Sequence, residues 1–249
     1  MTAALETIGL VKRFGGILAT DNVAFRLEQG ARHALIGPNG AGKTTFVNLL
    51  TGVLAPSSGT ILLAGEDVTH LRSDLRVRRG LARTFQINQL FADMTPLEAL
   101  ALAVSERRGG GRAWWRRVGG SGVVAEVAEI AARFRLTDVL AQRTASLAYG
   151  KQRLLEIALA FASRPRVLLL DEPAAGVPQA ERQELVATVA ALPREVSVLL
   201  IEHDMDLVFA YADRISVLVN GALLTEGPTE VVAKDERVRA VYLGEEQHG

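Results

Sequence analysis

The chain has 249 residues, 49% of them hydrophobic, which is enough to bury a sizeable core and excludes disorder over its bulk. Its 28 basic residues balance 28 acidic residues, so no overall charge draws it to nucleic acid or to anionic lipid. It has no cysteine, which excludes disulfides and thiolate metal sites and favours a reducing compartment, and no apolar run approaches the roughly 18 residues that cross a bilayer.

The N-terminal part is predicted to consist of strands. The first residues, MTAALETIGL, lack the basic and apolar regions of a signal peptide. Runs of strand length follow, separated by glycine or polar residues, in ETIGLV, NVAFRLE and RHALIG. The later runs TILLAG, RVLLLDE and SVLLIEHD are apolar nearly throughout, which is typical of parallel strands covered on both faces.

Helical patterns alternate with these strands in KTTFVNLLTG, KQRLLEIALAFAS and QAERQELVATVAAL, and this alternation predicts an α/β fold. Asn220-Gly221 between two apolar runs predicts a hairpin with a type I′ turn. Residues from about 87 to 165 are mainly helical and predict a separate lobe. Within it, residues 105–122 are expected to be a solvated insertion, or to touch lipid headgroups or a membrane partner through Trp114, Trp115 and the arginines around them.

The first chemical motif is GPNGAGKTT, residues 37–45, which fits the pattern GxxxxGK[ST] between a predicted strand and a predicted helix. Consecutive N–H groups in such a loop wrap phosphate oxygens, and the helix N-terminus adds positive potential. Lys43 is placed to reach the β- and γ-phosphates, and Thr44 offers a magnesium ligand. Chance alone gives this pattern with odds on the order of one in a hundred, so we interpret it as a nucleotide site.

The second motif, RVLLLDEP, is an apolar strand that ends in two carboxylates. Ligands gather at the carboxyl ends of strands in an open α/β sheet, so Asp171 and Glu172 are expected beside the phosphate loop. Asp171 is placed to hold Mg²⁺, and Glu172 is placed to polarise the attacking water. The plain alternative is a core strand with solvated acids at its end, and the phosphate loop upstream favours the catalytic interpretation.

Three further residues are candidates by position. His203 follows the strand in LLIEHDMD, where it can bond the γ-phosphate or the attacking water; otherwise it caps a helix or fills a surface gap. Phe14 can stack on adenine or belong to the core. Gln86 closes a strand-like run, and its amide can reach Mg²⁺ or water, although a lone glutamine is usually a surface residue.

In this order the motifs resemble the ATP-binding subunits of ABC transporters, over nearly the whole chain. The family order is an adenine-stacking aromatic, a phosphate loop, a Q-loop, a signature helix, a Walker B strand with its glutamate, and a switch histidine. The segments GLARTFQINQLFADMTPLEALALA, SLAYGKQRLLEIA, LLLDEPAAG and RVRAVYLGEE are more narrowly similar to the LivG-type ATPases of branched-chain amino-acid importers. That subgroup also includes urea and amide uptake systems.

The resemblance implies the P-loop NTPase fold of ABC ATPases, with an N-terminal antiparallel β subdomain and a helical subdomain. We expect one ATP-binding domain over residues 1–249, with residues 1–86 and 166–249 as the core and 87–165 as the helical subdomain. The residues expected to bind ATP are Phe14, Gly37, Pro38, Asn39, Gly40, Ala41, Gly42, Lys43, Thr44 and Thr45, and, in trans, Ala148, Tyr149, Gly150, Lys151 and Gln152. Those expected in catalysis are Glu172, His203 and Gln86, and those expected at Mg²⁺ are Thr44, Gln86 and Asp171.

The resemblance implies that the signature helix acts on a partner subunit. In this family two subunits pair head to tail, and the signature helix of each subunit points at the γ-phosphate that the other subunit holds. Gly150 keeps the close backbone approach, whereas Ala148 and Tyr149 replace the serine and first glycine of the commoner LSGGQ. Pro178 stands where the wider family has aspartate, which removes a polar side chain and an N–H donor. We therefore expect altered ATP-driven pairing and altered communication between the two sites.

The implied partners are transmembrane permease subunits, a second ATPase subunit (another copy or a LivF-like chain) and, indirectly, a solute-binding protein, with no nucleic acid. The implied location is peripheral, at the cytoplasmic face of the inner membrane. Candidates for the permease-docking groove, or else for the lobe core, are Phe85, Ile87, Leu90, Phe91 and Met94. The arginines between residues 72 and 83 are expected to form a solvated face with some salt bridges: Arg72, Arg76, Arg78, Arg79 and Arg83.

Two other functions compete with the importer interpretation. A lipopolysaccharide-export ATPase is also a membrane-docked single cassette, but it is expected to keep LSGG. A non-hydrolysing nucleotide-binding regulator is disfavoured by Glu172 and His203.

Overall fold

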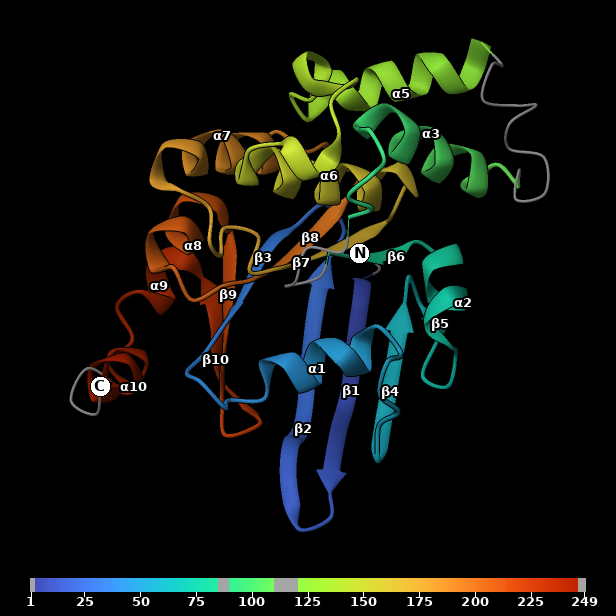
Figure 1. Cartoon of the computed structure of the whole chain (residues 1–249). Coiled ribbons are helices and arrows are strands. Elements are labelled where there is room, and N and C mark those ends of the chain that lie inside the picture. Colours follow the sequence, from blue (N-terminus) through green and yellow to red (C-terminus); the bar gives the residue numbers. More distant parts are fainter. Residues whose placement is uncertain (1–2, 85–89, 110–120, 246–249) are drawn as a thin grey trace. The chain divides into compact units, whose positions relative to one another are not determined.

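The computed structural model of the chain describes residues 3–84, 90–109 and 121–245. These residues form two compact units (Figure 1). Unit 1 comprises Met1–Leu81, Arg166–Glu172 and Pro193–Gly249, and unit 2 comprises Ala82–Pro165 and Pro173–Leu192. The assignment of both units to a single ATP-binding domain, with boundaries at 86/87 and 165/166, stays a prediction.

Unit 1 contains an antiparallel sheet with the strand order β2-β1-β4-β5. Its strands are β1 (Ala3–Phe14), β2 (Ile17–Glu28), β4 (Ser58–Leu63) and β5 (Glu66–Asp67). The pairing of β1 with β2 runs from Ala3 opposite Glu28 to Phe14 opposite Ile17, so the chain reverses at two glycines. This long hairpin is the expected N-terminal β part of the fold.

The second sheet has the order β10-β9-β3-β8-β7-β6. Its strands are β3 (Arg32–Ile36), β6 (Leu81–Arg83), β7 (Val167–Asp171), β8 (Ser197–Ile201), β9 (Arg214–Val219) and β10 (Ala222–Pro228). Strands β3, β7 and β8 are buried at every residue, and β3 pairs parallel with both β8 and β9, while β7 pairs parallel with β8. The apolar runs RVLLLDE and SVLLIEHD are therefore central parallel strands, as predicted. The same prediction is wrong for TILLAG, which belongs to β4 of the antiparallel sheet, where burial alternates along the strand because only one face packs on the core.

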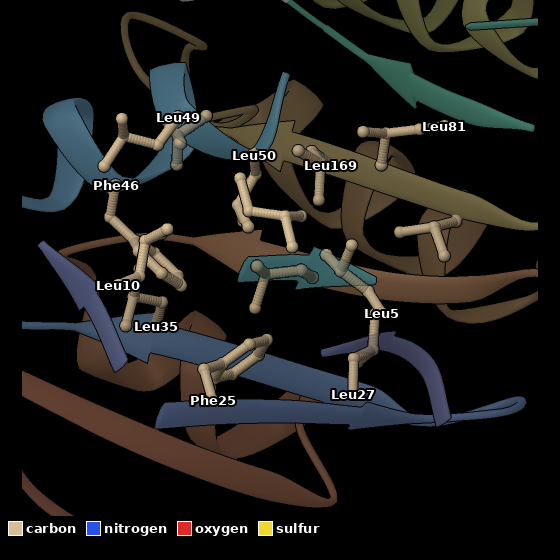
Figure 2. Close-up of a cluster of buried hydrophobic side chains, with 14 of the residues drawn as sticks. Leu5, Leu10, Phe25, Leu27, Leu35, Phe46, Leu49, Leu50, Leu81 and Leu169 are labelled. Carbon is tan, nitrogen blue, oxygen red and sulfur yellow. The ribbon is translucent and has the colours of Figure 1, made fainter. Parts of the chain in front are cut away.

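Helices of unit 1 follow these strands. They are α1 (Lys43–Leu50), α2 (Ser73–Arg78), α8 (Met205–Tyr211), α9 (Thr229–Val232) and α10 (Glu236–Glu245). Helix α1 buries Phe46, Val47, Leu49 and Leu50 in a core shared with β1, β2, β3 and β7 (Figure 2). One core thus joins the two sheets of unit 1 to the helix that begins at the phosphate loop.

The predicted hairpin between β9 and β10 is confirmed. Asn220 and Gly221 have φ values of 47° and 81°, as a type I′ turn requires at both central positions. The Gly221 N–H donates to the Ala41 carbonyl, and the Asp21 N–H donates to the Gly221 carbonyl. The turn therefore ties the phosphate loop to β2.

Unit 2 is helical. Its elements are α3 (Pro96–Arg107), α5 (Ser121–Arg133), α6 (Tyr149–Ala162), α7 (Gln179–Ala190) and the short 3₁₀ turns Thr137–Val139 and Thr144–Ser146. Helix α3 starts with a capping box, in which Thr95 and Glu98 satisfy each other's backbone N–H groups. Glu126 of α5 accepts hydrogen bonds from Arg107 and Arg108, and Arg107 lowers the pKa of Glu126 to about 2. The predicted helical lobe thus contains a capped helix and an ion-pair cluster around the buried Glu126 carboxylate.

The expectation of a solvated arginine face is wrong for one residue. Arg72 and Arg79 are exposed and pair with Asp74 and Glu66, as expected. Arg76, however, is buried and is bonded to backbone carbonyls. Its side chain fills the space between α1 and α2. The spacing of the arginines in the sequence does not reveal that this one is buried.

Among residues 3–84, 90–109 and 121–245, no helix is both long enough and apolar enough to cross a membrane.

Candidate functional site

The loop between β3 and α1, residues 37–42, is lined by backbone because side chains do not fit at two of its glycines. A Cβ at Gly37 would lie 2.1 Å from the Leu218 carbonyl oxygen. Gly42 has a φ of 100°, and a Cβ there would lie 2.4 Å from the Ala19 carbonyl oxygen. Such a loop presents consecutive peptide groups to a ligand, which is the form that wraps phosphate oxygens.

Helix α1 begins with an N-terminus suited to an anion. No side chain caps it, and its first turn holds no acidic residue. Lys43 Nζ donates to the carbonyl oxygens of Gly37 (2.5 Å) and Pro38 (2.9 Å), which holds the ammonium over the loop. Thr44 is exposed in the same turn and Thr45 is half-buried. The helix end and the lysine together concentrate positive potential at one place.

The remaining loop residues differ in exposure. Asn39 and Gly40 are exposed, Pro38 is half-buried and Ala41 is buried. Asn39 and Gly40 are therefore the loop residues that a ligand can contact from solvent.

Three predicted site segments follow adjacent parallel strands and meet at one edge of the sheet. The phosphate loop follows β3, and His203 lies two residues after β8. Asp171 is the last residue of β7, and Glu172 comes directly after it. Because β3, β8 and β7 are parallel neighbours, their carboxyl ends lie together. The structure therefore gathers these residues within unit 1, as the sequence argument expected.

The carboxylates and the histidine at this edge are held by the backbone. Glu172 has a φ of 46°, and its N–H donates to the Ile201 carbonyl at 2.9 Å. Glu172 Oε1 lies 3.6 Å from His203 Nδ1, and the His203 side chain is 64% exposed. A left-handed backbone at a non-glycine residue of a candidate site is a common form of local strain. The geometry leaves both side chains facing a position that solvent or a ligand can reach.

A residue without a predicted role supports this edge. Glu202 is 1% exposed, and its Oε2 accepts a hydrogen bond from the His203 N–H at 3.1 Å. Asp204 caps α8 by accepting from the Leu207 N–H. His203 thus lies between a buried carboxylate and a helix cap. The sequence signal for the role of Glu202 is its position directly before a histidine at a strand end.

Phe14 ends β1 and its side chain is not part of the core. The residue is 45% exposed, and Lys12 Nζ lies 5.1 Å from the centre of its ring. Phe14 pairs with Ile17, only two residues before Ala19, whose carbonyl approaches Gly42. The end of the β1–β2 hairpin therefore lies close to the phosphate loop, where an exposed ring can stack on a base.

The predicted signature residues lie at the start of α6, in unit 2. Ala148 is the N-cap and makes no side-chain cap bond. The Gly150 N–H donates to Glu181 Oε2 of α7 at 2.6 Å, and a Cβ at Gly150 would lie 2.5 Å from that same oxygen. A carboxylate therefore occupies the N-terminal end of this helix, in contrast with the start of α1.

The other signature side chains are engaged within unit 2. Lys151 Nζ donates to the Arg135 carbonyl and lies 3.4 Å from Asp138 and from Glu184. Gln152 Nε2 donates to the Leu147 carbonyl at 3.0 Å, and the Arg153 guanidinium lies over the Tyr149 ring at 5.3 Å. The Ser146 hydroxyl donates to the Arg143 carbonyl, so it does not stand in for the hydroxyl missing at Ala148.

Pro178 is the N-cap of α7 and makes no side-chain cap bond, whereas Val177 before it is buried. The Pro178 carbonyl accepts the Glu181 and Arg182 N–H groups. The proline thus directly precedes the helix that carries Glu181, and its φ of −55° lies in the range that the proline ring fixes.

Several predicted residues lie outside the described residues. These are Gln86, Phe85, Ile87, Trp114, Trp115 and the arginines beside the tryptophans. Of the other groove candidates, Phe91 is exposed, and Leu90 and Met94 are half-buried.

The described donors fit a magnesium ion that takes its other ligands from phosphate and water. Thr44 offers an exposed hydroxyl, and Asp171 offers a buried carboxylate at the end of β7. Both are hard oxygen ligands of the kind that Mg²⁺ prefers, and among the described residues no cluster of three acidic, histidine or cysteine side chains suggests another metal.

A sheet with central parallel strands, a phosphate loop followed by a lysine at a helix start, paired acids at a strand end and a helical unit define a class of ATPase. The family model described as "ABC transporter" matches residues 20–175. The chain belongs to the ABC transporter family, and its predicted ABC ATPase fold is confirmed.

Relatives within the family are similar over almost their whole length. The branched-chain amino acid transport ATP-binding protein BraF of Pseudomonas aeruginosa is 41% identical, with 97% of this chain and 98% of BraF covered. The protein LivG of Escherichia coli K12 is 40% identical with the same coverage. A nucleotide-free ATP-binding cassette from an ABC transporter matches with a TM-score of 0.82 and 29% identity, over 97% of this chain and 99% of the cassette.

Proposed function

We propose that this chain is the ATP-binding and hydrolysing subunit of an ABC importer for branched-chain amino acids, or for a related amino acid, amide or urea. One observation carries the catalytic part of this proposal. A phosphate loop, two carboxylates and a histidine from three adjacent parallel strands meet at one sheet edge, with His203 Nδ1 3.6 Å from Glu172 Oε1. The names of the similar proteins BraF and LivG support the importer part.

Binding of the triphosphate rests on the loop and on α1. The N–H groups of residues 37–45 and the start of α1 attract the β- and γ-phosphates, and the Lys43 ammonium exchanges the carbonyls of Gly37 and Pro38 for phosphate oxygens. The Phe14 ring stacks on the adenine. Thr44, Asp171 and the Gln86 amide would hold Mg²⁺, which would supply charge neutralisation at the phosphates.

Hydrolysis needs a water molecule in line with the bond that breaks. The Glu172 carboxylate orients this water and accepts its proton as the water oxygen bonds to the γ-phosphorus. The bond from the γ-phosphorus to the β–γ bridging oxygen breaks, and ADP and inorganic phosphate are formed. His203 lies beside Glu172 and donates a hydrogen bond toward the γ-phosphate, while Glu202 holds the histidine backbone in place.

The pocket is completed by a second ATPase subunit, which is another copy or a LivF-like chain. Residues Ala148, Tyr149, Gly150, Lys151 and Gln152 of one subunit face the γ-phosphate held by the other. Closure around ATP draws the subunits together, and loss of the γ-phosphate releases them. We also propose that units 1 and 2 together form one ATP-binding domain, because relatives of single-cassette length cover nearly the whole chain.

The closure is coupled to transmembrane permease subunits, which receive solute from a solute-binding protein. The chain docks on the permease at the cytoplasmic face of the inner membrane as a peripheral subunit. Uptake of labelled leucine, urea and acetamide by lipid vesicles that contain the complex purified from native membranes would identify the solute class. Export of lipid without uptake of any of these solutes would favour the lipopolysaccharide alternative.

The catalytic assignment is tested by Glu172→Gln. We expect ATP turnover to fall at least about 100-fold, because a general base contributes rate factors of that size, while MgATP binding stays within about twofold. Glu230→Gln is the matched control, since Glu230 is exposed in the first turn of α9. Turnover that is equal in the Glu172→Gln variant and the wild-type chain would overturn the assignment.

A further inference from the structure

Arg76 of α2 is the most deeply buried arginine that the site description leaves without a role. It is 1% exposed, and it lies in unit 1 with α1 and the phosphate loop. Its guanidinium makes four hydrogen bonds, and every acceptor is a backbone carbonyl. Nη1 donates to Leu49 (2.6 Å) and Leu50 (2.7 Å), Nη2 donates to Thr69 (2.9 Å), and Nε donates to Leu71 (2.9 Å).

Leu49 and Leu50 are the last two residues of α1. The final carbonyls of a helix have no partner within it, and they carry the negative end of the helix dipole. The Gly52 N–H reaches the Leu49 carbonyl, and among the described residues Arg76 supplies the side-chain donor to both Leu49 and Leu50. Arg76 is therefore a cationic cap on the C-terminal end of the helix that begins at Lys43.

The buried charge is balanced by these carbonyls. Burial lowers the Arg76 pKa to about 10, so the guanidinium stays protonated at neutral pH, and Asp67 partly opposes the shift. Asp67 itself is bonded to the Thr69 hydroxyl and N–H. Loss of Arg76 would therefore remove the side-chain hydrogen-bond donor from the carbonyls of Leu49 and Leu50 at the end of α1, which is unfavourable where these groups are buried.

The chain after α1 is shaped to receive the guanidinium. Gly52 has a φ of 74°, and a Cβ there would lie 2.8 Å from the Leu71 carbonyl oxygen and 2.9 Å from Arg76 Nε. The turn that follows the helix therefore packs directly on the arginine. With 8 residues, α1 spans about 12 Å, so a tilt at its C-terminal end moves its N-terminal end.

We propose that Arg76 is a positioning residue for nucleotide binding: it clamps the C-terminal end of α1 and so holds the loop, Lys43 and Thr44 in the phosphate-binding arrangement. The inference rests on the proposed function of residues 37–45. The two ends of α1 are then complementary, because Arg76 neutralises the negative end permanently, and the nucleotide phosphates neutralise the positive end when they bind.

The test compares Arg76→Lys and Arg76→Met with the matched controls Arg78→Lys and Arg78→Met, since Arg78 is exposed on the same helix. We expect KM for MgATP and Kd for MgATP to rise about tenfold in the Arg76 variants, as when the binding-competent fraction falls to roughly a tenth. The turnover number kcat should change less than twofold, because the bound state has the same chemistry at Glu172.

Hydrogen exchange separates this role from a purely stabilising one. In the Arg76 variants without nucleotide, residues 43–54 should lose protection while β9 and β10 keep theirs, and MgATP should restore the protection of residues 43–54. An Arg76→Lys variant with lower thermal stability but wild-type KM and Kd would overturn the proposal.

A measurement on the wild-type chain covers the case in which both variants fail to fold. The Arg76 Nε–H resonance, assigned with ¹⁵N-arginine, should exchange slowly with solvent and shift when MgATP binds. A resonance that MgATP leaves unchanged would overturn the proposal. The Lys43→Met variant distinguishes failure of the proposed nucleotide site from failure of the proposed role of Arg76. If Lys43→Met binds MgATP as well as the wild-type chain does, the nucleotide site at residues 37–45 is wrong. If only the Arg76 variants bind MgATP normally, the positioning role of Arg76 alone is wrong.

Discussion

The starts of α1 and α6 are two helix N-termini with similar sequence signals and different surroundings. Both lie next to a glycine that has no room for a Cβ, and neither carries a side-chain cap. At α1 the Lys43 ammonium donates to carbonyls of the phosphate loop, whereas at α6 the Glu181 carboxylate accepts the Gly150 N–H. No side chain caps the first end, whereas a carboxylate already bonds the second. Under the proposed function, phosphate would therefore have to displace that carboxylate at α6.

The largest expected effect comes from adding one methyl group at either helix start. Gly42→Ala should abolish measurable MgATP binding, because its Cβ meets the Ala19 carbonyl and φ is left-handed. Gly150→Ala should leave MgATP binding within about twofold and lower ATP turnover about 100-fold, since displacement of a helix tip by an ångström has effects of that order. Equilibrium binding of MgATP and steady-state ATP turnover are measured for both variants. Loss of MgATP binding in Gly150→Ala would remove the distinction between the two helix starts.

A smaller effect is expected when the carboxylate at α6 is neutralised. Glu181→Gln replaces a charge-assisted hydrogen bond with a neutral one, a change of roughly 1 to 1.5 kcal/mol. In a Glu172→Gln background, MgATP-driven pairing with the second ATPase subunit should tighten about tenfold, as measured by analytical ultracentrifugation. Glu129→Gln, exposed on α5, is the control. Weaker pairing in Glu181→Gln would mean that the carboxylate supports the helix start and does not compete with phosphate.

The smallest expected effect is the change in the stability of each unit with pH, which depends on the buried groups His33 in unit 1 and Glu126 in unit 2. Burial lowers the pKa of His33, below the phosphate loop on β3, to about 4. A lowered histidine pKa means that the unfolded chain binds the proton more readily, so unit 1 should lose stability as the pH falls from about 6.5 to 4, by at most about 1.4 kcal/mol per pH unit. The lowered pKa of Glu126 acts on unit 2 only between about 4.5 and 2.

Hydrogen exchange at pH 7, 6 and 5 tests this difference between the units. Protection should fall in unit 1 and hold in unit 2, and His33→Asn should flatten the dependence, whereas His70→Asn at an exposed histidine should not. Equal loss in both units above pH 5 would contradict the assignment. In the folded chain, Ser216 donates its hydroxyl to Glu226, so His33 Nε2 carries the hydrogen that Ser216 accepts, and Nδ1 of the neutral ring is an acceptor that is buried without a hydrogen-bond partner.

The sequence was sufficient where the signal is local. The strand VLLLD, the loop GPNGAGKTT and the turn Asn220-Gly221 are each set by a few consecutive residues, and the fold places them as predicted. The apolar character of VLLLD and SVLLI predicts central parallel strands, and the observed order of β3, β8 and β7 brings Glu172 and His203 together.

The sequence was insufficient where a side chain acts on a distant part of the chain. Arg76 bonds a carbonyl 27 residues away, and Gly150 bonds a carboxylate 31 residues away. Neither pairing has a periodic signature, and an arginine among other arginines is ordinarily read as solvated. Only the packing of α1 against α2, and of α6 against α7, reveals which charged residue is buried and what it contacts.

The central claim is that the start of α6 lies against the γ-phosphate position of a nucleotide held by a phosphate loop. Orthovanadate trapped with MgADP in the complex from native membranes occupies that position, and ultraviolet light then cleaves the backbone beside it. We predict cleavage both within residues 37–45 and within residues 147–152, and none at 147–152 with MgADP alone. Cleavage confined to residues 37–45 in a fully trapped complex would contradict the account.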